Sequence, residues 1–331
     1  MRKGLKGVLP LAVAALATVA AGCGGGSSSS SSSGGDSNVS LTQGGDITIA
    51  MVTHSDEGSF WSVVKKGAEA AAKSEGVTLK WSPSNNDPQK QAQLIDAAVS
   101  EKVDGLAVSV PNADAIKGSL AKAKDAGIPI ITLNSGADVS KELGAITHVG
   151  QDEVVAGRAA GERLKSEGAK KVACIIHEQG NVGLQQRCQG VEEGFGGDVE
   201  TVQVKGTEDI STTQTEIQSK LQADKSIDAV IALNPDIAEG AKTAIKGASS
   251  DAKLATFDQS GPVIKDIEAG SILFAVDQQQ YLQGYLPVTF LKLFLTNANT
   301  VGGGQAVLTG PGFVDKSNAS TIEKLAADGS R

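Results

Sequence analysis

The stretch ITIAMVTH at residues 47–54 decides the fold, because its pattern returns in the second half of the chain. A second apolar run, VACIIH at 172–177, also ends in a histidine, and a glycine follows each histidine thirteen residues later. Further landmarks keep almost the same offset between the copies: Gly67 and Gly190, Asp104 and Asp228, Asn134 and Asp258, Gln151 and Gln278, Gly157 and Gly284. The offset drifts only from 123 to 127 residues, which predicts two lobes of one design.

Each predicted lobe alternates apolar runs with stretches of helical periodicity. In the first lobe, the run at 47–53 is followed by FWSVVKKGAEAAAKS at 60–74, whose apolar residues are spaced as on one face of a helix. The same order of elements repeats from 171 to 256. Strands separated by helices of this length predict parallel sheets with right-handed crossovers. The predicted fold class is therefore α/β, with two similar doubly wound parallel-sheet lobes.

Residues 1–22 are similar to a bacterial lipoprotein signal. A basic start is followed by an apolar stretch over 7–21 that is too short and too rich in alanine to prefer spanning a bilayer, and Cys23 comes next. The similarity implies cleavage before Cys23 and acylation of that residue, which would anchor the chain to the outer side of the cell membrane. The alternative is an ordinary secretory peptide with an incidental cysteine. Residues 23–44, rich in Gly and Ser, are predicted to be a flexible tether.

The mature chain is expected to be acidic. The whole sequence has a formal net charge of −8, and residues 1–22 hold three basic and no acidic residues, so their removal gives −11. Such a charge argues against nucleic acid as a partner. Roughly 285 residues remain after the tether, which is enough for two domains with cores of their own.

The cysteines fit a compartment outside the cytoplasm. Apart from Cys23, the sequence holds Cys174 in a predicted strand and Cys188 in the following helix. In an oxidising compartment such a pair can form a disulfide. The alternative is that Cys174 is simply a small buried apolar residue, and the sequence leaves both open. A CxxC pattern and a cluster of metal-ligand residues are absent from the sequence, so neither a metal nor a cofactor is expected.

The loops after the predicted strands carry the candidate binding residues, because ligands meet a parallel sheet at the carboxyl ends of its strands. Hydroxyl groups of a sugar or polyol pair with amides and carboxylates, while the C–H face of the ligand packs on aromatic rings such as Phe60 and Trp61. Asn, Asp and Ser also cap helices, and Phe60 could be a core residue, so each position alone has a structural alternative. The polar candidates are Asn134, Gln151, Asp152, Asn181, Arg187, Asn234, Asp258 and Gln278.

Longer motifs then follow in a specific order, among them GSFWSVVKKGAEAAA (58–72), AKDAGIPIITLNS (123–135), VGQDEVVAG (149–157), ATFDQS (255–260) and AVDQQQYLQGY (275–285). In this order they resemble the type I periplasmic binding proteins of the ribose-binding kind, which deliver sugars to the permease subunits of ABC importers. The resemblance covers nearly the whole chain after the tether. It implies two lobes, 45–151 with 278–305 and 152–277 with 306–331. Three crossing segments would join them, near Gln151, near Asp277 and over 304–308.

The resemblance also assigns roles to individual residues. It implies that Phe60 and Trp61 sandwich the sugar ring, that Asp152 lies near the first hinge and that Arg187 contacts the ligand. Hydroxyl groups would be bound by Asn234, Asp258 and Gln278. The sequence departs from the family at Asn134 and Ser135, where the ribose-type pattern has Asp-Arg. Since a bidentate charged pair is lost there, we expect a different pentose, another monosaccharide or an acyclic polyol as ligand rather than ribose.

The expected function is capture of a small ligand by a monomer, not catalysis. The sequence lacks the GxSxG, Walker A, GxGxxG and HExxH motifs. Its histidines are His54, His148 and His177, and the two at strand ends, His54 and His177, are interpreted as structural. The alternatives left open are a nucleoside-binding lipoprotein and a ligand-sensing module that serves a membrane receptor kinase. A panel of ligands separates the first from a sugar binder, and genomic neighbours identify the second.

Overall fold

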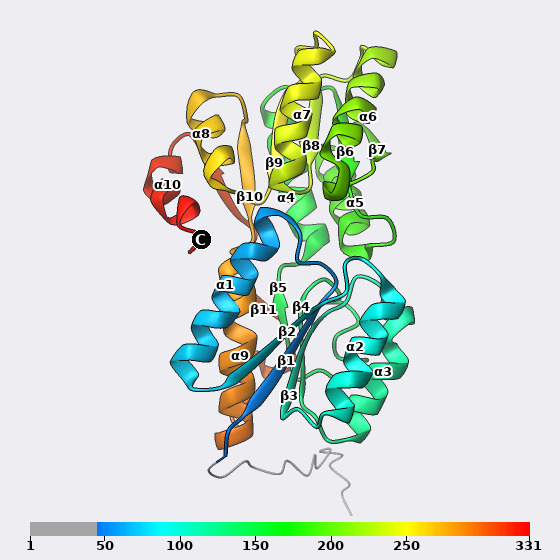
Figure 1. Cartoon of the computed structure of the whole chain (residues 1–331). Coiled ribbons are helices and arrows are strands. Elements are labelled where there is room, and N and C mark those ends of the chain that lie inside the picture. Colours follow the sequence, from blue (N-terminus) through cyan, green and yellow to red (C-terminus); the bar gives the residue numbers. More distant parts are fainter. Residues whose placement is uncertain (1–44) are drawn as a thin grey trace, which may run out of the picture. The chain divides into compact units, whose positions relative to one another are not determined.

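A computed structural model describes residues 45–331 of the chain, which form two α/β lobes, each built on a six-stranded sheet (Figure 1). The predicted signal, Cys23 and the tether lie outside the described residues. The first sheet has the order β11 (Val307–Leu308), β5 (His148–Gly150), β4 (Ile130–Asn134), β3 (Gly105–Ser109), β1 (Thr48–Thr53) and β2 (Thr78–Pro83). The second has the order β12 (Gly312–Asp315), β10 (Phe274–Asp277), β9 (Lys253–Phe257), β8 (Ala229–Ala232), β6 (Lys171–Ile176) and β7 (Asp198–Gln203).

The two sheets share one topology, which confirms the predicted fold class. Strand β1 pairs in parallel with β2 and β3, and its counterpart β6 pairs in parallel with β7 and β8. The sheets differ at one edge, where β11 runs parallel to β5 but β12 runs antiparallel to β10.

Helices cover both faces of each sheet (Figure 1). In the first lobe, α1 (Gly58–Glu75) and α9 (Gln280–Asn297) pack on one face, and α2 (Pro88–Ser100) and α3 (Ala113–Asp125) pack on the other. Side chains of β1 alternate between the two cores, as expected for a strand: Ile49 and Met51 face α1 and α9, while Ala50 and Val52 face α2 and α3.

The second lobe follows the same plan. Helices α4 (Glu153–Ser166) and α5 (Val182–Phe195) pack on one face of its sheet. The other face is covered by α6 (Ile210–Ala223), α7 (Pro235–Gly247), α8 (Gly261–Ala269) and α10 (Ala319–Ala327). Two short 3-10 helices, Thr207–Asp209 and Gly302–Gly304, complete the elements of the described part. Between residues 45 and 331 no helix has the length and apolar character that crossing a membrane requires.

The repeated glycines bring helices into close contact. A Cβ at Gly67 of α1 would collide with the carbonyl oxygen of Tyr281 in α9, and a Cβ at Gly284 would collide with that of Val64. The same relation holds between α4 and α5, because Gly157 lies against the Arg187 carbonyl and Gly190 against the Val154 carbonyl. The glycines that mark the repeat in the sequence are therefore the points where each helix pair needs a residue without a side chain.

The chain passes between the sheets three times, after β5, after β10 and after β11. The last passage lies later than the sequence predicts. Val307 pairs with Val149 and Leu308 with Gly150, and the Thr309 N–H donates to the Gly150 carbonyl at 2.7 Å. The predicted boundary after residue 305 is therefore too early, because β11 still belongs to the first sheet.

Candidate ligand-binding site

A cavity lies at the carboxyl ends of the strands and is lined by residues of both lobes. Nine of the eleven residues predicted from the sequence line it: Phe60, Trp61, Asn134, Ser135, Asn181, Arg187, Asn234, Asp258 and Gln278. Gln151 and Asp152 are not among the lining residues. The remaining lining residues are His54, His177, Glu178, Gly183, Leu184 and Leu233.

The first turn of α1 supplies an aromatic wall. The rings of Phe60 and Trp61 meet edge to face, with centroids 5.2 Å apart and an interplanar angle of 86°. Trp61 makes a second edge contact with His54, at 4.8 Å. Both aromatic side chains are buried and also belong to the core between the sheet and α9. The core and binding interpretations of Phe60 are thus compatible, because one side chain lies in the core and lines the cavity.

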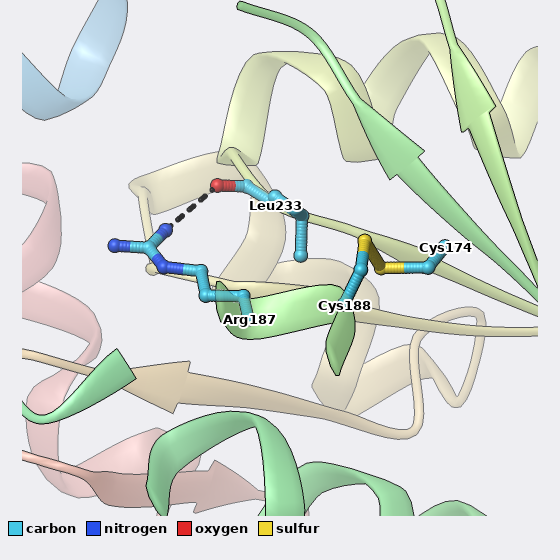
Figure 2. Close-up of a disulfide and its surroundings, with 4 residues drawn as sticks. All are labelled: Cys174, Arg187, Cys188 and Leu233. Atoms are coloured by element: carbon cyan, nitrogen blue, oxygen red, sulfur yellow. Dashed lines mark hydrogen bonds between the residues drawn. A yellow bond between two sulfur atoms is a disulfide. The ribbon is translucent and has the colours of Figure 1, made fainter. Parts of the chain in front are cut away.

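Arg187 of α5 is held in a fixed orientation by the second lobe. Its Nε donates to Glu153 Oε2 at 2.6 Å and its Nη2 to Oε1 at 2.9 Å. Figure 2 shows the third hydrogen bond, which its Nη1 donates to the Leu233 carbonyl at 3.2 Å. The guanidinium also lies over the ring of Phe257, at 4.8 Å. Burial lowers the pKa of Arg187, but the carboxylates of Glu153, Asp258 and Glu178 together raise it above its ordinary value. A guanidinium has five N–H groups, so two remain for a ligand.

A disulfide lies next to this arginine. Cys174 of β6 and Cys188 of α5 are joined, with Cα atoms 5.8 Å apart (Figure 2). The two cysteines are also buried in the core of the lobe. Cys174 is therefore both a disulfide cysteine and a buried apolar residue, and the two alternatives are compatible. Because Cys188 directly follows Arg187, the bridge ties the turn of helix that carries the guanidinium to β6.

Asp258 follows β9 and is 2 % exposed. Its Oδ2 lies 4.0 Å from Arg187 Nη1, and its Oδ1 has no hydrogen-bond partner among the described residues. Burial raises the pKa of Asp258 to about 7, although the positive charge of Arg187 opposes the shift. The side chain of Gln278 also acts to lower the pKa of Asp258. This carboxyl group is therefore one that a ligand hydroxyl can satisfy.

Two histidines and a glutamate form a cluster at the strand ends that sequence reasoning missed. His54 Nε2 lies 3.5 Å from Glu178 Oε2, and His177 Nε2 lies 4.0 Å from Glu178 Oε1. Burial raises the pKa of Glu178, but His54, His177 and a hydrogen bond from Asn181 together hold it well below its usual range. Burial lowers the pKa of His177 to about 4, so this imidazole is neutral at neutral pH.

The structural interpretation of the histidines is only partly right. His54 Nδ1 is paired with Ser109 Oγ at 2.8 Å, but His177 Nδ1 is buried and lacks a partner in the part of the chain that the structure describes. The sequence held a signal for both histidines, since each one directly follows the first strand of its lobe.

The asparagines combine a structural contact with a place in the cavity. Asn234 caps α7 by accepting the Asp236 N–H at 2.8 Å, and Asn181 caps α5 by accepting the Gly183 N–H at 3.0 Å. Capping uses only the side-chain oxygen, so the amide nitrogen of Asn234 can serve a ligand. In the other lobe, Asn134 Nδ2 donates to Gln283 at 3.3 Å and Ser135 Oγ donates to Asn134 at 3.0 Å.

Asp152 does not join the other predicted residues. Its side chain is exposed and caps α4, accepting the Val155 N–H at 2.9 Å. The next residue, Glu153, is buried and makes the ion pair with Arg187. Asp152 therefore does not line the cavity, because capping of α4 turns its side chain outward, and Glu153 acts on the site only through Arg187.

The site is equipped for binding. Within residues 45–331, no group of three His, Cys, Asp or Glu side chains is placed to hold a metal ion. The cavity instead combines an aromatic wall, amides, a fixed guanidinium and a carboxyl group with an unpaired oxygen. Fold and site together define a two-lobed binding protein for a small polar ligand.

Comparison with known proteins gives the family. A family model described as a periplasmic binding protein domain matches residues 49–299. The ribose import binding protein of Haemophilus influenzae is 25% identical over 76% of this chain and 86% of its own length. The chain therefore belongs to the periplasmic binding protein family, in its ribose-binding-like type I form. Members of this family are extracytoplasmic, non-enzymatic components of transport, in agreement with the expectation that the chain is not an enzyme.

Two further relatives carry different ligands in their names. A carbohydrate transporter of Acidothermus cellulolyticus, solved in complex with myo-inositol, is 47% identical and has a TM-score of 0.85, covering 87% of this chain and 100% of that one. The D-apiose import binding protein of Actinobacillus succinogenes is 27% identical over 84% of this chain and 91% of its own length.

Proposed function

We propose that the chain is the extracytoplasmic, lipid-anchored substrate-binding protein of an ABC importer, and that it captures a monosaccharide or polyol between its lobes by hinge closure. The observation that carries the proposal is the cavity, in which an aromatic wall of the first lobe faces the guanidinium and carboxyl group of the second. A ligand with hydroxyl groups and an apolar face satisfies both sides at once.

We infer that myo-inositol is the first ligand to test. The 47% identical protein of Acidothermus cellulolyticus was solved with it. The residues Asn134 and Ser135, which stand where the ribose-type pattern has Asp-Arg, also favour a ligand other than ribose. A ring that carries hydroxyls all around it and has no anomeric centre needs no charged pair at that position.

Hinge closure is supported by the way the lobes share the site. A ligand that contacts both lobes binds the closed form more tightly than the open form and shifts the population by that difference in affinity. The three passages of the chain between the sheets are the segments about which such a movement would occur. The permease subunits would then recognise the closed form.

A thermal-shift panel tests the ligand. Protein stripped of carried-over ligand is scanned with myo-inositol, xylitol, D-ribose, D-xylose, D-apiose and adenosine. Ligand at about a hundred times its dissociation constant adds about 2.7 kcal/mol, which moves the midpoint by several degrees. A rise with polyol or sugar is expected. A rise with adenosine alone would move the assignment to a nucleoside-binding lipoprotein.

The anchor rests on the sequence around Cys23 and needs its own test. Metabolic labelling with a radioactive fatty acid should mark the wild-type chain and leave a Cys23→Ser variant unlabelled. Export of an unlabelled wild-type chain would show an ordinary secretory peptide instead.

A further inference from the structure

Helix α1 begins without a cap from its own lobe. Glu57 occupies the N-cap position, but its side chain makes no capping hydrogen bond in the described structure. The acceptor comes from Asp236 in the first turn of α7, in the other lobe. Its Oδ2 accepts the Ser59 N–H at 3.0 Å, and its Oδ1 accepts the Ser59 hydroxyl at 3.1 Å. Gly58 permits this approach, since a Cβ there would collide with Asp236 Oδ2.

A second hydrogen bond between the lobes lies at the equivalent position, with the roles of the two lobes exchanged. The Val182 N–H in the first turn of α5 donates to the Pro111 carbonyl of the first lobe at 3.1 Å. Ser59 and Val182 are 123 residues apart, which is the repeat offset of their helices. Pro111 lies in the loop that follows β3, and Asp236 lies in the first turn of α7, which follows β8. Strands β3 and β8 are equivalent in the two sheets. Each lobe thus supplies an acceptor for the first turn of the other lobe's ligand-facing helix.

We propose that these two contacts are reciprocal latches of the closed form, and that Asp236 is a positioning residue that sets ligand affinity without touching the ligand. The proposal rests on the hinge closure proposed above. Asp236 is absent from the residues that line the described cavity, but Ser59 directly precedes Phe60 and Trp61. A carboxylate at a helix N-terminus is also stabilised by the helix dipole. Asp236 therefore holds the aromatic wall in place from the opposite lobe.

The chain offers a matched control for this residue. Asp209 accepts the Thr212 N–H at 2.9 Å and the Thr212 hydroxyl at 2.7 Å in the first turn of α6. The chemistry is the same as that between Asp236 and Ser59, but both partners lie in one lobe. Loss of either cap should lower stability, and only loss of the cap from the opposite lobe should change ligand binding.

Titration calorimetry with myo-inositol on the Asp236→Ala and Asp209→Ala variants tests the proposal. Loss of a cap of this kind should raise the Kd about tenfold for Asp236→Ala and leave it unchanged for Asp209→Ala. Asp236→Asn, which keeps an acceptor oxygen, should recover part of the affinity. In a Trp81→Phe background, Trp61 is the remaining tryptophan, and its emission should shift with Asp236→Ala but not with Asp209→Ala. Equal Kd values and equal emission in the two variants would overturn the proposal.

A second measurement needs no ligand. Under oxidation, Cys introduced at Ser59 and at Asp236 should crosslink, whereas Cys at Ser59 and at Asp209 should not. Absence of the first crosslink would also overturn the latch. If the wild-type chain failed to bind myo-inositol, the ligand assignment would fall, while the crosslink and the Trp61 emission would still decide the latch.

Discussion

Equivalent positions in the two lobes carry unlike side chains into one cavity. Trp61 in α1 corresponds to Leu184 in α5, and both line the cavity. Three residues further along each helix, Val64 corresponds to Arg187. Val64 is fully buried in the first core, whereas Arg187 presents a charged group held by Glu153. The first lobe thus supplies the apolar wall, and the second supplies most of the charge.

The ends of β4 and β9 show what is shared. Asn134 is the last residue of β4 and Asp258 directly follows β9, and the two have nearly the same left-handed φ, 62° and 64°. An amide and a carboxyl group of the same shape therefore reach the cavity from matching turns. The repeated backbone thus fixes where a side chain enters the site. The residue type at that position in each lobe decides what that half of the site recognises.

The largest effect is expected from replacing Arg187 by an apolar residue, as at the equivalent position Val64 of the first lobe. Arg187→Met leaves the Glu153 carboxylate buried without its partner, so we expect the free energy of unfolding to fall by about 3 to 5 kcal/mol. Combining it with Glu153→Met should recover most of that loss. Both variants should bind myo-inositol far more weakly than wild type. Urea unfolding and calorimetry measure the two effects, and full binding by the double variant would remove Arg187 from the site.

Removing the disulfide tests a feature that only the second lobe has. The positions equivalent to Cys174 and Cys188 are Met51 and Lys65. The bridge spans 14 residues of sequence, and closing a loop of about that length contributes about 3 kcal/mol in the chain-entropy model. The double Cys174→Ala, Cys188→Ala variant should lose about this much stability in thermal unfolding and keep its affinity. Reduced wild-type protein should unfold at the same midpoint as the variant.

Asp258→Asn gives the second lobe the amide that the first has at Asn134. Loss of charge-assisted hydrogen bonds should weaken ligand binding about ten- to a hundredfold. The effect of Asp258→Asn on the free energy of unfolding without ligand should have the opposite sign, so that the variant gains stability relative to wild type as the pH rises. Because the pKa of about 7 in the folded state lies above the ordinary 3.8, Asp258 contributes its stability below about pH 4 and loses it as the pH rises through 7.

The stability difference between Asp258→Asn and wild type, measured without ligand from pH 4 to pH 8, should therefore shift in favour of the variant as the pH rises. The pH dependence from His177 has the opposite sign, because its pKa is lowered to about 4 in the folded state, so the stability of the protein decreases as the pH falls through 4. That contribution is common to both proteins and cancels in the difference. A stability difference independent of pH would show that burial does not raise the pKa of Asp258.

Trp61→Leu is expected to have the smallest effect, and it gives the first lobe the residue that the second has at Leu184. Loss of one aromatic face should raise the Kd about tenfold. The first lobe would then carry the same residue type as the second at this position, while the polar side chains of the site remain unchanged. Calorimetry measures the change, and Trp81→Phe serves as the control because it alters the other tryptophan of the chain.

Much of the fold could be predicted from the sequence because it depends on repeated local patterns. The apolar runs at 47–53 and 172–176 became β1 and β6, and the paired glycines became the close contacts of α1 with α9 and of α4 with α5. The short β11 was missed. Two residues carry too little periodicity to indicate a strand, so the third crossing was placed too early.

The site was harder where neighbouring residues compete for one role. Asp152 and Glu153 are adjacent acids, and only the start of α4 decides that one caps the helix while the other pairs with Arg187. Glu178 gave no signal of its own, because its importance comes from His54, which is distant in sequence. The contact of Asp236 with Ser59 likewise depends on how the two lobes meet.

Calorimetric titration of wild type, Trp61→Leu and Asp258→Asn with myo-inositol tests most directly the claim that two unlike halves form one polyol site. We expect one ligand per wild-type chain and weaker binding in both variants, with the larger loss in Asp258→Asn. Wild-type affinity in either variant would contradict the claim, because one lobe would then contribute nothing to the site.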